Sequence, residues 1–398
     1  MRIGESDRMG LIPAYAFDEI RKKVADLRSK GVDVIDMGVG DPVRPTPENV
    51  RKACREGLEK YAATGYPPYS GTEELRGAAA RWMKKTFAVD LDMGKEIIST
   101  IGSKEAIFHF PAGLINDGDF VLIPSPGYPP YTTGTLFAGG KPLFYPLDAK
   151  NGFMPDLDVV RKLITDPPEG GRVKLIWTCY PNAPTGRVAA KGFYEELLPM
   201  LQKHNVVLAS DEAYADFVYT GEVVSPLQIA TEGVIAFYSF SKRSNMTGYR
   251  VGWAAGDRRL ISILLRLKTN IDSGTPGFIQ QAAVEALEDE ESTHEMREEY
   301  RALRDQLVGA FVSIGLDECR PEGAIYVWQR VPPGMSSAQF AARLLSPEIG
   351  VAGIPGDLIS RPLDDGTNPG EGYIRFSLTC LPERMKAVSE RIRKNLKV

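Results

Sequence analysis

The middle of the chain alternates short apolar runs with helical patterns, and this alternation constrains the fold more than any other feature. The runs are DFVLI, VKLIWT, NVVLA, VIAFYS and RVGWAA, at residues 119–123, 173–178, 205–209, 234–239 and 250–255. Such short, unbroken runs are typical of strands buried on both faces. Helical patterns lie between them, near 104–116, 156–164 and 192–204. The sequence therefore predicts an α/β fold around a mostly parallel sheet.

The pattern changes near residue 290, where a charged amphipathic stretch, 292–314, begins. It is followed by the strand-like segments YVWQR and GYIRFSL and by a helical pattern near 382–396. A chain of 398 residues with 43% hydrophobic residues is long enough for two cores. We predict a large domain over 46–289 and a smaller α+β domain formed by 290–398 with the N-terminal arm, 1–45.

Composition argues against several classes of protein. The formal net charge of −4 gives no reason to expect binding to nucleic acid or an anionic membrane. Four cysteines without CxxC spacing predict reduced thiols, and three scattered histidines argue against a metal site. The N-terminus has no apolar signal-like segment, and no apolar run approaches the roughly 20 residues of a membrane span. We therefore expect a cytoplasmic protein.

A lysine follows the fourth apolar run, in the segment SFSKRSNMTGYRVGW, residues 239–253. Most lysines are solvated surface charges, and Lys242 taken alone fits that reading. Its neighbours favour another. Ser239, Ser241 and Arg250 are suited to binding a phosphate, by hydroxyl groups and by a bidentate guanidinium. An imine-forming lysine beside phosphate-binding groups is what a pyridoxal-phosphate site requires.

Polar residues also follow two other runs. In SDEAYADF, a carboxylate at a strand end would face the ligand crevice of an α/β sheet. We choose Asp211 as the partner of a pyridine nitrogen, and Glu212 is the alternative, otherwise a solvated or helix-start carboxylate. Tyr214 is near enough to reach the ring's phenolic oxygen. In the turn CYPNAPTG, Asn182 is either a donor to that oxygen or an ordinary turn residue.

Three further residues have both a functional and a structural interpretation. Ser103, in TIGSKEAI, marks a helix start that is either an anion site or a simple N-cap, or both. Tyr128, in PSPGYPPY, either stacks on a flat cofactor or packs against protein. Arg375 lies within the apolar strand pattern GYIRFSL, where an unpaired charge is costly. It binds either a substrate carboxylate or a structural ion-pair partner.

Taken in order, these segments resemble the class I/II aminotransferases, pyridoxal-phosphate enzymes of fold type I, over nearly the whole chain. The resemblance implies a large domain with a seven-stranded, mostly parallel sheet and homodimers with shared active sites. It implies that Lys242 forms the Schiff base with the cofactor, and that Asp211 and Tyr214 complete the catalytic set. The remaining implied roles are phosphate binding by Ser103, Lys104, Ser239 and Arg250, ring contacts by Tyr128 and Asn182, phosphate contact across the dimer by Tyr66, and substrate binding by Gly40, Lys104, Asn182 and Arg375.

The amino-acid sequences of several segments resemble one group within this family still more closely. MGVGDPVRPTP, GYPPYSG, NGFMPDLD, SNMTGYRVGW and EGYIRFSLT are similar to LL-diaminopimelate aminotransferases, which implies amino-group exchange with 2-oxoglutarate in lysine biosynthesis. Tyr69 departs from the pattern, because some members carry there a Glu that helps to recognise the distal end of diaminopimelate. LKTNIDSGTP also lacks the distal Arg of dicarboxylate-specific aspartate aminotransferases, and Lys104 is a candidate replacement.

Several alternatives remain beside this interpretation. One alternative is a different amino donor, namely N-succinyldiaminopimelate, aspartate or another amino acid. A second is a different reaction, that of a pyridoxal-phosphate β-lyase or decarboxylase, since fold does not fix reaction. Ser239 and Lys242 also satisfy the SxxK spacing of serine acyl-transfer enzymes, but no SDN or KTG accompanies them. Gly38 and Gly40 lack the third glycine of a dinucleotide loop. No basic segment supports a cofactor-sensing DNA regulator.

Overall fold

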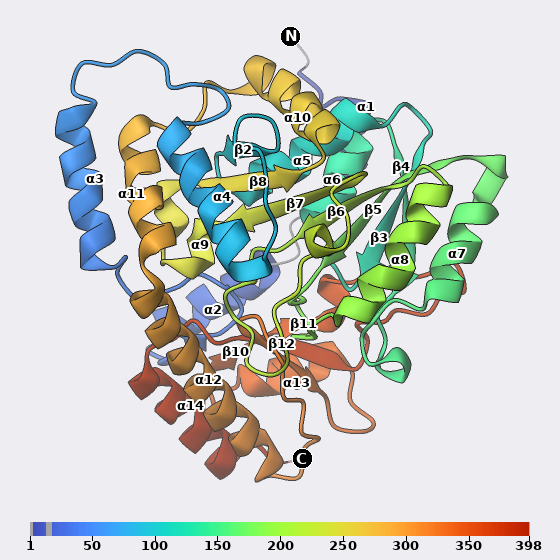
Figure 1. Cartoon of the computed structure of the whole chain (residues 1–398). Coiled ribbons are helices and arrows are strands. Elements are labelled where there is room, and N and C mark those ends of the chain that lie inside the picture. Colours follow the sequence, from blue (N-terminus) through green and yellow to red (C-terminus); the bar gives the residue numbers. More distant parts are fainter. Residues whose placement is uncertain (1–2, 13–17, 398) are drawn as a thin grey trace.

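The computed structural model describes residues 3–12 and 18–397, and its largest feature is a seven-stranded sheet (Figure 1). The strand order is β2-β8-β7-β6-β5-β3-β4. All neighbours pair in parallel except β8, which runs antiparallel to both β2 and β7. The bounds are β2 Ile97–Thr100, β3 Phe120–Ser125, β4 Lys141–Pro146, β5 Val173–Cys179, β6 Val207–Asp211, β7 Val234–Ser239 and β8 Gly252–Gly256. The predicted α/β class and mostly parallel sheet are confirmed.

The five apolar runs became β3, β5, β6, β7 and β8, whereas β2 and β4 were not predicted. β4 has the sequence KPLFYP, and its two prolines obscure a strand pattern. Proline is tolerated there because β4 lies at one edge of the sheet, where a missing backbone donor costs less. β2 is only four residues long and occupies the other edge.

Helices cover both faces of this sheet, each over a separate apolar core (Figure 1). One core includes Trp82, Tyr194 and Leu208, and the other includes Phe110, Trp177 and Leu264. The helices that contribute to the first core are α3 Glu48–Lys60, α4 Glu73–Phe87, α7 Leu157–Thr165, α8 Lys191–Lys203 and α11 Gly277–Glu288. Those that contribute to the second are α5 Ser103–Leu114, α6 Pro129–Phe137 and α10 Arg258–Ile271.

The C-terminal part forms two small sheets with help from the N-terminal part. β9 Tyr326–Arg330, β12 Tyr373–Ser377 and β11 Ile354–Pro355 pair antiparallel. β1 Ile35–Asp36 pairs in parallel with β10 Val351–Ala352, so the first strand belongs with the last part of the chain. The helices here are α2 Asp18–Ser29, α12 Glu290–Val312, α13 Ser337–Leu344 and α14 Pro382–Asn395. The short helix α1, Asp7–Gly10, lies apart from them at the other end of the molecule (Figure 1).

The division into 46–289 and the paired segments 1–45 and 290–398 stays a proposal. The β1–β10 pairing is consistent with it. Tyr214 and Phe217, however, pack in the same core as α12 and α14, so the two parts share buried side chains. Within the residues described, no helix combines the length and apolarity needed to cross a bilayer.

Parallel pairing sets where polar residues meet. In the register of β5 with β6, Cys179 lies beside Asp211, and Asp211 lies beside Phe237 of β7. The carboxyl ends of these three strands therefore form one edge, which is where open α/β sheets bind ligands.

Candidate active site

A cavity of about 970 Å³ opens at this carboxyl edge, between the large sheet and the C-terminal sheet. All but two of the predicted site residues line it. Those that do are Gly40, Ser103, Lys104, Tyr128, Asp211, Tyr214, Ser239, Lys242, Arg250 and Arg375. The two exceptions are Asn182 and Tyr66. Residues that are far apart in sequence thus share one chamber.

Lys242 projects into the cavity from α9, Phe240–Arg243, a short helix that begins directly after β7. Ser239 is its N-cap and accepts a hydrogen bond from the Ser241 N–H at 3.2 Å. Lys242 Nζ donates a hydrogen bond to the carbonyl oxygen of Gly40, on the opposite wall. The side chain is only partly exposed, so its amine is held within reach of a ligand.

Asp211 presents a buried carboxyl to the same space. One oxygen accepts a hydrogen bond from the Tyr131 hydroxyl at 2.7 Å, and the other accepts from the Ala213 N–H at 3.2 Å. Burial raises the pKa of this carboxyl to about 6, because the anion loses solvation, although both hydrogen bonds oppose the shift. A cation opposite Asp211 would lower that pKa and hold the anion.

Glu212 is neither solvated nor a helix start, so that interpretation of it is wrong. It is 2% exposed and does not line the cavity. Its oxygens accept hydrogen bonds from Ser225 at 2.9 Å and Tyr238 at 2.8 Å. Burial raises the pKa of its carboxyl to about 8, and the neighbouring Asp211 adds to the shift. Successive strand residues face opposite sides of a sheet, which separates the two carboxyls.

Tyr326 of β9 joins three of the predicted residues, although its importance was not recognised from sequence. Its hydroxyl lies 3.2 Å from that of Tyr214, and the Arg375 guanidinium lies 4.6 Å from the centre of its ring. Arg375 also donates a hydrogen bond to the Gly38 carbonyl at 2.7 Å. A Cβ at Gly40 would lie 2.0 Å from the Tyr326 hydroxyl, so any other residue here would displace the Tyr326 ring.

The start of α5 forms a small cradle with Arg250. Gly102, with φ of 75°, is the N-cap, so the interpretation of Ser103 as a simple N-cap is wrong. A Cβ at Gly102 would lie 2.6 Å from Arg250 Nη2, and one at Gly252 would lie 2.9 Å from the Ser103 nitrogen. Arg250 itself donates to the Thr247 carbonyl at 2.8 Å. A guanidinium facing the first turn of a helix is suited to an anion.

Asn182, Tyr66 and Tyr128 differ in how far they take part. The Asn182 side chain serves its own turn, accepting from the Thr185 N–H and hydroxyl at 3.0 and 2.8 Å and donating to the Cys179 carbonyl at 3.1 Å. Tyr66 is 85% exposed and stands outside the cavity. Tyr128 lines the cavity, with its ring edge-on to that of Tyr131 at 5.7 Å.

The mostly parallel sheet, with a lysine and a buried carboxyl at its carboxyl edge, is the arrangement expected of the fold type I class. Sequence comparison identifies the family within that class. Residues 32–392 match the family described as aminotransferase class I and II, and the chain belongs to this family. The predicted family and enzyme class are confirmed.

Relatives and solved structures agree with this assignment. The chain is 42% identical to the LL-diaminopimelate aminotransferase of Aquifex aeolicus over 99% of each chain. It is 42% identical to LL-diaminopimelate aminotransferase 2 of Trichormus variabilis over 97% of each. The aspartate aminotransferase of Thermus thermophilus with maleate superposes with a TM-score of 0.89, at 32% identity over 100% of both chains. Substrate-bound BacF of Bacillus subtilis superposes with a TM-score of 0.87, at 30% identity over 99% and 98%. The fold type I prediction is confirmed.

Membership of this family implies amino-acid and 2-oxo-acid substrates and pyridoxal phosphate as cofactor. The residues present fit that cofactor. Because Gly102 and Gly252 carry no Cβ, the Arg250 guanidinium and β8 come close to the first turn of α5, and the guanidinium and the helix N–H groups together suit a phosphate. Asp211 is a buried acceptor for a protonated ring nitrogen, and Lys242 supplies an amine for a carbonyl carbon.

Proposed function

We propose that this aminotransferase moves the amino group of LL-diaminopimelate to 2-oxoglutarate, in lysine biosynthesis. The observation that carries the proposal is the near-complete match to relatives of that name, at 42% identity over 99% of both chains for the Aquifex aeolicus protein. The large cavity is consistent with it, since it has room for a seven-carbon dicarboxylic acid beside a cofactor.

The cofactor's place follows from the donor groups of the chain. Ser103, Lys104, Ser239 and Arg250 would hold the phosphate of pyridoxal phosphate, and Tyr128 would cover its ring. Asp211 would keep its ring nitrogen protonated, with the Tyr131 hydrogen bond fixing the carboxylate. Tyr214 and Asn182 are the proposed donors to the phenolic oxygen. The Asn182 amide nitrogen carries a second hydrogen beyond the one given to Cys179, so it can serve both.

Three residues then act on the substrate. Arg375 binds the α-carboxylate with its planar guanidinium. Gly40 has no side chain and so lets the backbone approach the substrate closely. Lys242 Nζ takes the proton from the substrate Cα as general base. It later delivers a proton to the C4′ carbon of the cofactor as general acid. Bound pyridoxal phosphate supplies the electron sink that makes the Cα proton acidic. A second acid reverses the sequence, so ping-pong kinetics are expected.

A donor screen with 2-oxoglutarate as acceptor tests the proposal. Formation of glutamate from LL-diaminopimelate should exceed that from meso-diaminopimelate, N-succinyldiaminopimelate and aspartate. The donors in this screen differ mainly at their distal end. That end is the one recognised by the Glu that some relatives carry at the position of Tyr69. A clear preference for another donor would reject the assignment, and release of pyruvate and ammonia would indicate a β-lyase.

Two further expectations stay predictions. The family resemblance implies a homodimer, in which the exposed Tyr66 would reach the phosphate of the partner's cofactor. A cytoplasmic location is the second of these predictions.

A further inference from the structure

Arg361 lies in the loop after η5, Gly356–Leu358, where the C-terminal part contacts the end of β3. The Ser125 side chain, at the end of β3, accepts a hydrogen bond from the Arg361 N–H and donates one to the Arg361 carbonyl, both at 2.8 Å. Ser125 is 1% exposed, and the Gly127 N–H adds a bond to the Ile359 carbonyl at 3.2 Å. The backbone of Arg361 is therefore fixed at the rim of the cavity.

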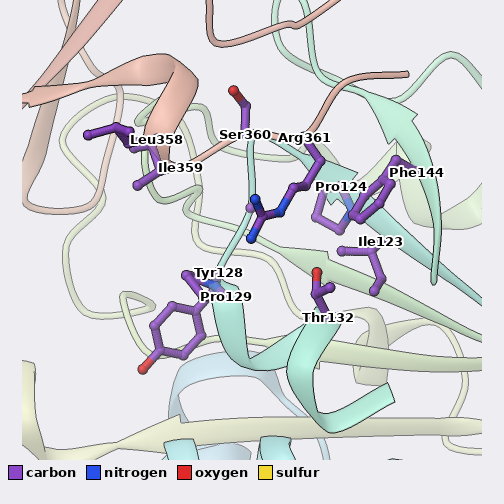
Figure 2. Close-up of a pocket in the computed structure, with 11 residues that line it drawn as sticks. Ile123, Pro124, Tyr128, Pro129, Thr132, Phe144, Leu358, Ile359, Ser360 and Arg361 are labelled. Carbon is purple, nitrogen blue, oxygen red and sulfur yellow. The ribbon is translucent and has the colours of Figure 1, made fainter. Parts of the chain in front are cut away.

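The side chain of Arg361 points inward from this anchor. Figure 2 shows its guanidinium extending from the loop toward Tyr128 and Pro129, at the start of α6. Arg361 lines the large cavity together with Tyr128, Lys242 and Arg375. It is partly buried, and in residues 3–12 and 18–397 no carboxylate lies within ion-pair distance of its guanidinium. A half-buried guanidinium without an acidic neighbour is suited to an anionic ligand.

The other two guanidinium groups of the cavity stand elsewhere, and its ammonium groups belong to Lys104 and Lys242. Arg375 lies against Gly38 and Tyr326, and Arg250 lies against Thr247 and the start of α5. Arg361 instead lies against the turn between β3 and α6. The three guanidinium groups that line the cavity therefore stand at separate points of its wall.

We propose that Arg361 binds the distal carboxylate of the substrates and so selects dicarboxylic amino acids and oxo acids. This inference rests on the proposed function, in which LL-diaminopimelate and 2-oxoglutarate each carry a carboxylate beyond the one bound by Arg375. A guanidinium matches a carboxylate with two parallel hydrogen bonds, which makes the contact selective for carboxylates over neutral groups.

Two matched donor pairs test the role of Arg361 in the holoenzyme. LL-Diaminopimelate and L-lysine differ only by the distal carboxylate, and so do L-glutamate and L-2-aminobutyrate. The first half-reaction of each donor is followed by cofactor absorbance, giving a ratio of kcat/KM within each pair. Wild-type protein should favour the carboxylate member. Arg361→Gln should lower that preference by about 10- to 100-fold, the effect of losing hydrogen bonds to a charged group.

Arg361→Lys keeps the charge without the fork and should restore part of the preference, which a purely structural role would not predict. Equal losses for both members of a pair, or an unchanged ratio in Arg361→Gln, would overturn the proposal. The proposal would also fail if the wild-type protein showed no preference for the carboxylate member of each pair. It would fail equally if Lys104→Gln, and not Arg361→Gln, abolished that preference. If wild-type protein does not use LL-diaminopimelate, the proposed function fails, while the glutamate pair still decides the role of Arg361.

Discussion

At the scale of single residues, the chemistry depends on one amine whose surroundings keep it inside the cavity. Lys242→Ala removes the group proposed to move the Cα proton, and we expect kcat to fall by at least about 10²- to 10⁴-fold. Lys141→Ala is a matched control, because Lys141 pairs with Glu169 on the surface, away from the cavity. Steady-state transamination with thermal melting checks both variants. Near-normal turnover in Lys242→Ala would refute the assignment of the base.

The adjacent carboxyls Asp211 and Glu212 have separate roles because the sheet separates them. Folding raises the pKa of Glu212 from 4.5 to about 8, so the folded chain keeps a proton that the unfolded chain releases. This contribution to stability is full below pH 4.5 and is lost as pH rises through about 8. Glu212→Gln cannot titrate, so its stability relative to wild type should increase from pH 5 to 9.

Urea denaturation of the cofactor-free wild type and Glu212→Gln at several pH values measures this difference. Using cofactor-free protein for both removes any contribution from ligand binding, and Asp211 titrates in both chains alike. Stability curves that stay parallel across the pH range would mean that Glu212 is not held protonated by its burial.

The limits of sequence reasoning are clearest at this scale. Asp211, Ser239 and Lys242 follow apolar runs, and strand ends were expected to converge. Tyr131, Tyr326 and Arg361 were missed because their partners are distant in sequence, and no local pattern records such contacts. Tyr131 lies 80 positions from Asp211, Tyr326 lies 49 positions from Arg375, and Arg361 lies 236 positions from Ser125. For Ser103 the sequence allowed an N-cap, an anion site or both, since Ser favours the N-cap position. The N-cap is Gly102 instead, where a Cβ would lie 2.6 Å from Arg250 Nη2.

At the scale of elements, a buried ion network joins α5 to α10. Lys268 is fully buried, and its Nζ lies 2.8 Å from Glu105 and 2.9 Å from Asp272. Glu105 also accepts a hydrogen bond from the Ile101 N–H at 3.0 Å, just before the anion cradle. Lys268→Met leaves two carboxylates without their cation, and we expect it to cost about 3–5 kcal/mol of unfolding free energy.

Chemical denaturation measures this loss, and Lys268→Met/Glu105→Gln should recover part of it by removing one orphaned charge. Arg266 lies on the same helix as the buried Lys268, but its side chain is exposed. Arg266→Met is therefore a matched control with little expected effect. Equal stability of the two single variants would show that the network contributes nothing beyond surface charge.

The sequence predicted the strands that are buried on both faces, but it did not predict the edge strand β4, where partly exposed residues and prolines are tolerated. The central strands are mostly apolar and buried because helices cover both faces. β4 alternates in burial and carries two prolines, so its pattern is that of a loop until its edge position is known. The pairing of β1 with β10 joins residues more than 300 positions apart, which periodicity cannot predict.

At the scale of the whole molecule, the cavity is assembled from three stretches of chain. The large sheet supplies Lys242 and Asp211, the C-terminal sheet supplies Arg375, and the N-terminal segment supplies the Gly40 carbonyl between them. The loop between α3 and α4, which contains Tyr66, runs along the outside of the molecule (Figure 1). A phenol that is 85% exposed cannot serve the cavity of its own chain in this arrangement.

Mixing two inactive variants tests whether Tyr66 acts across a dimer. In a heterodimer of Lys242→Ala and Tyr66→Ala chains, one site has both defects and the other has neither. Random exchange of subunits should therefore restore about a quarter of wild-type activity, because half of the dimers carry one intact site. Tyr66→Ala alone should lose cofactor affinity while keeping its fold, as measured by cofactor titration and melting. A mixture no more active than the separate variants would place Tyr66 in its own subunit's site or outside any site.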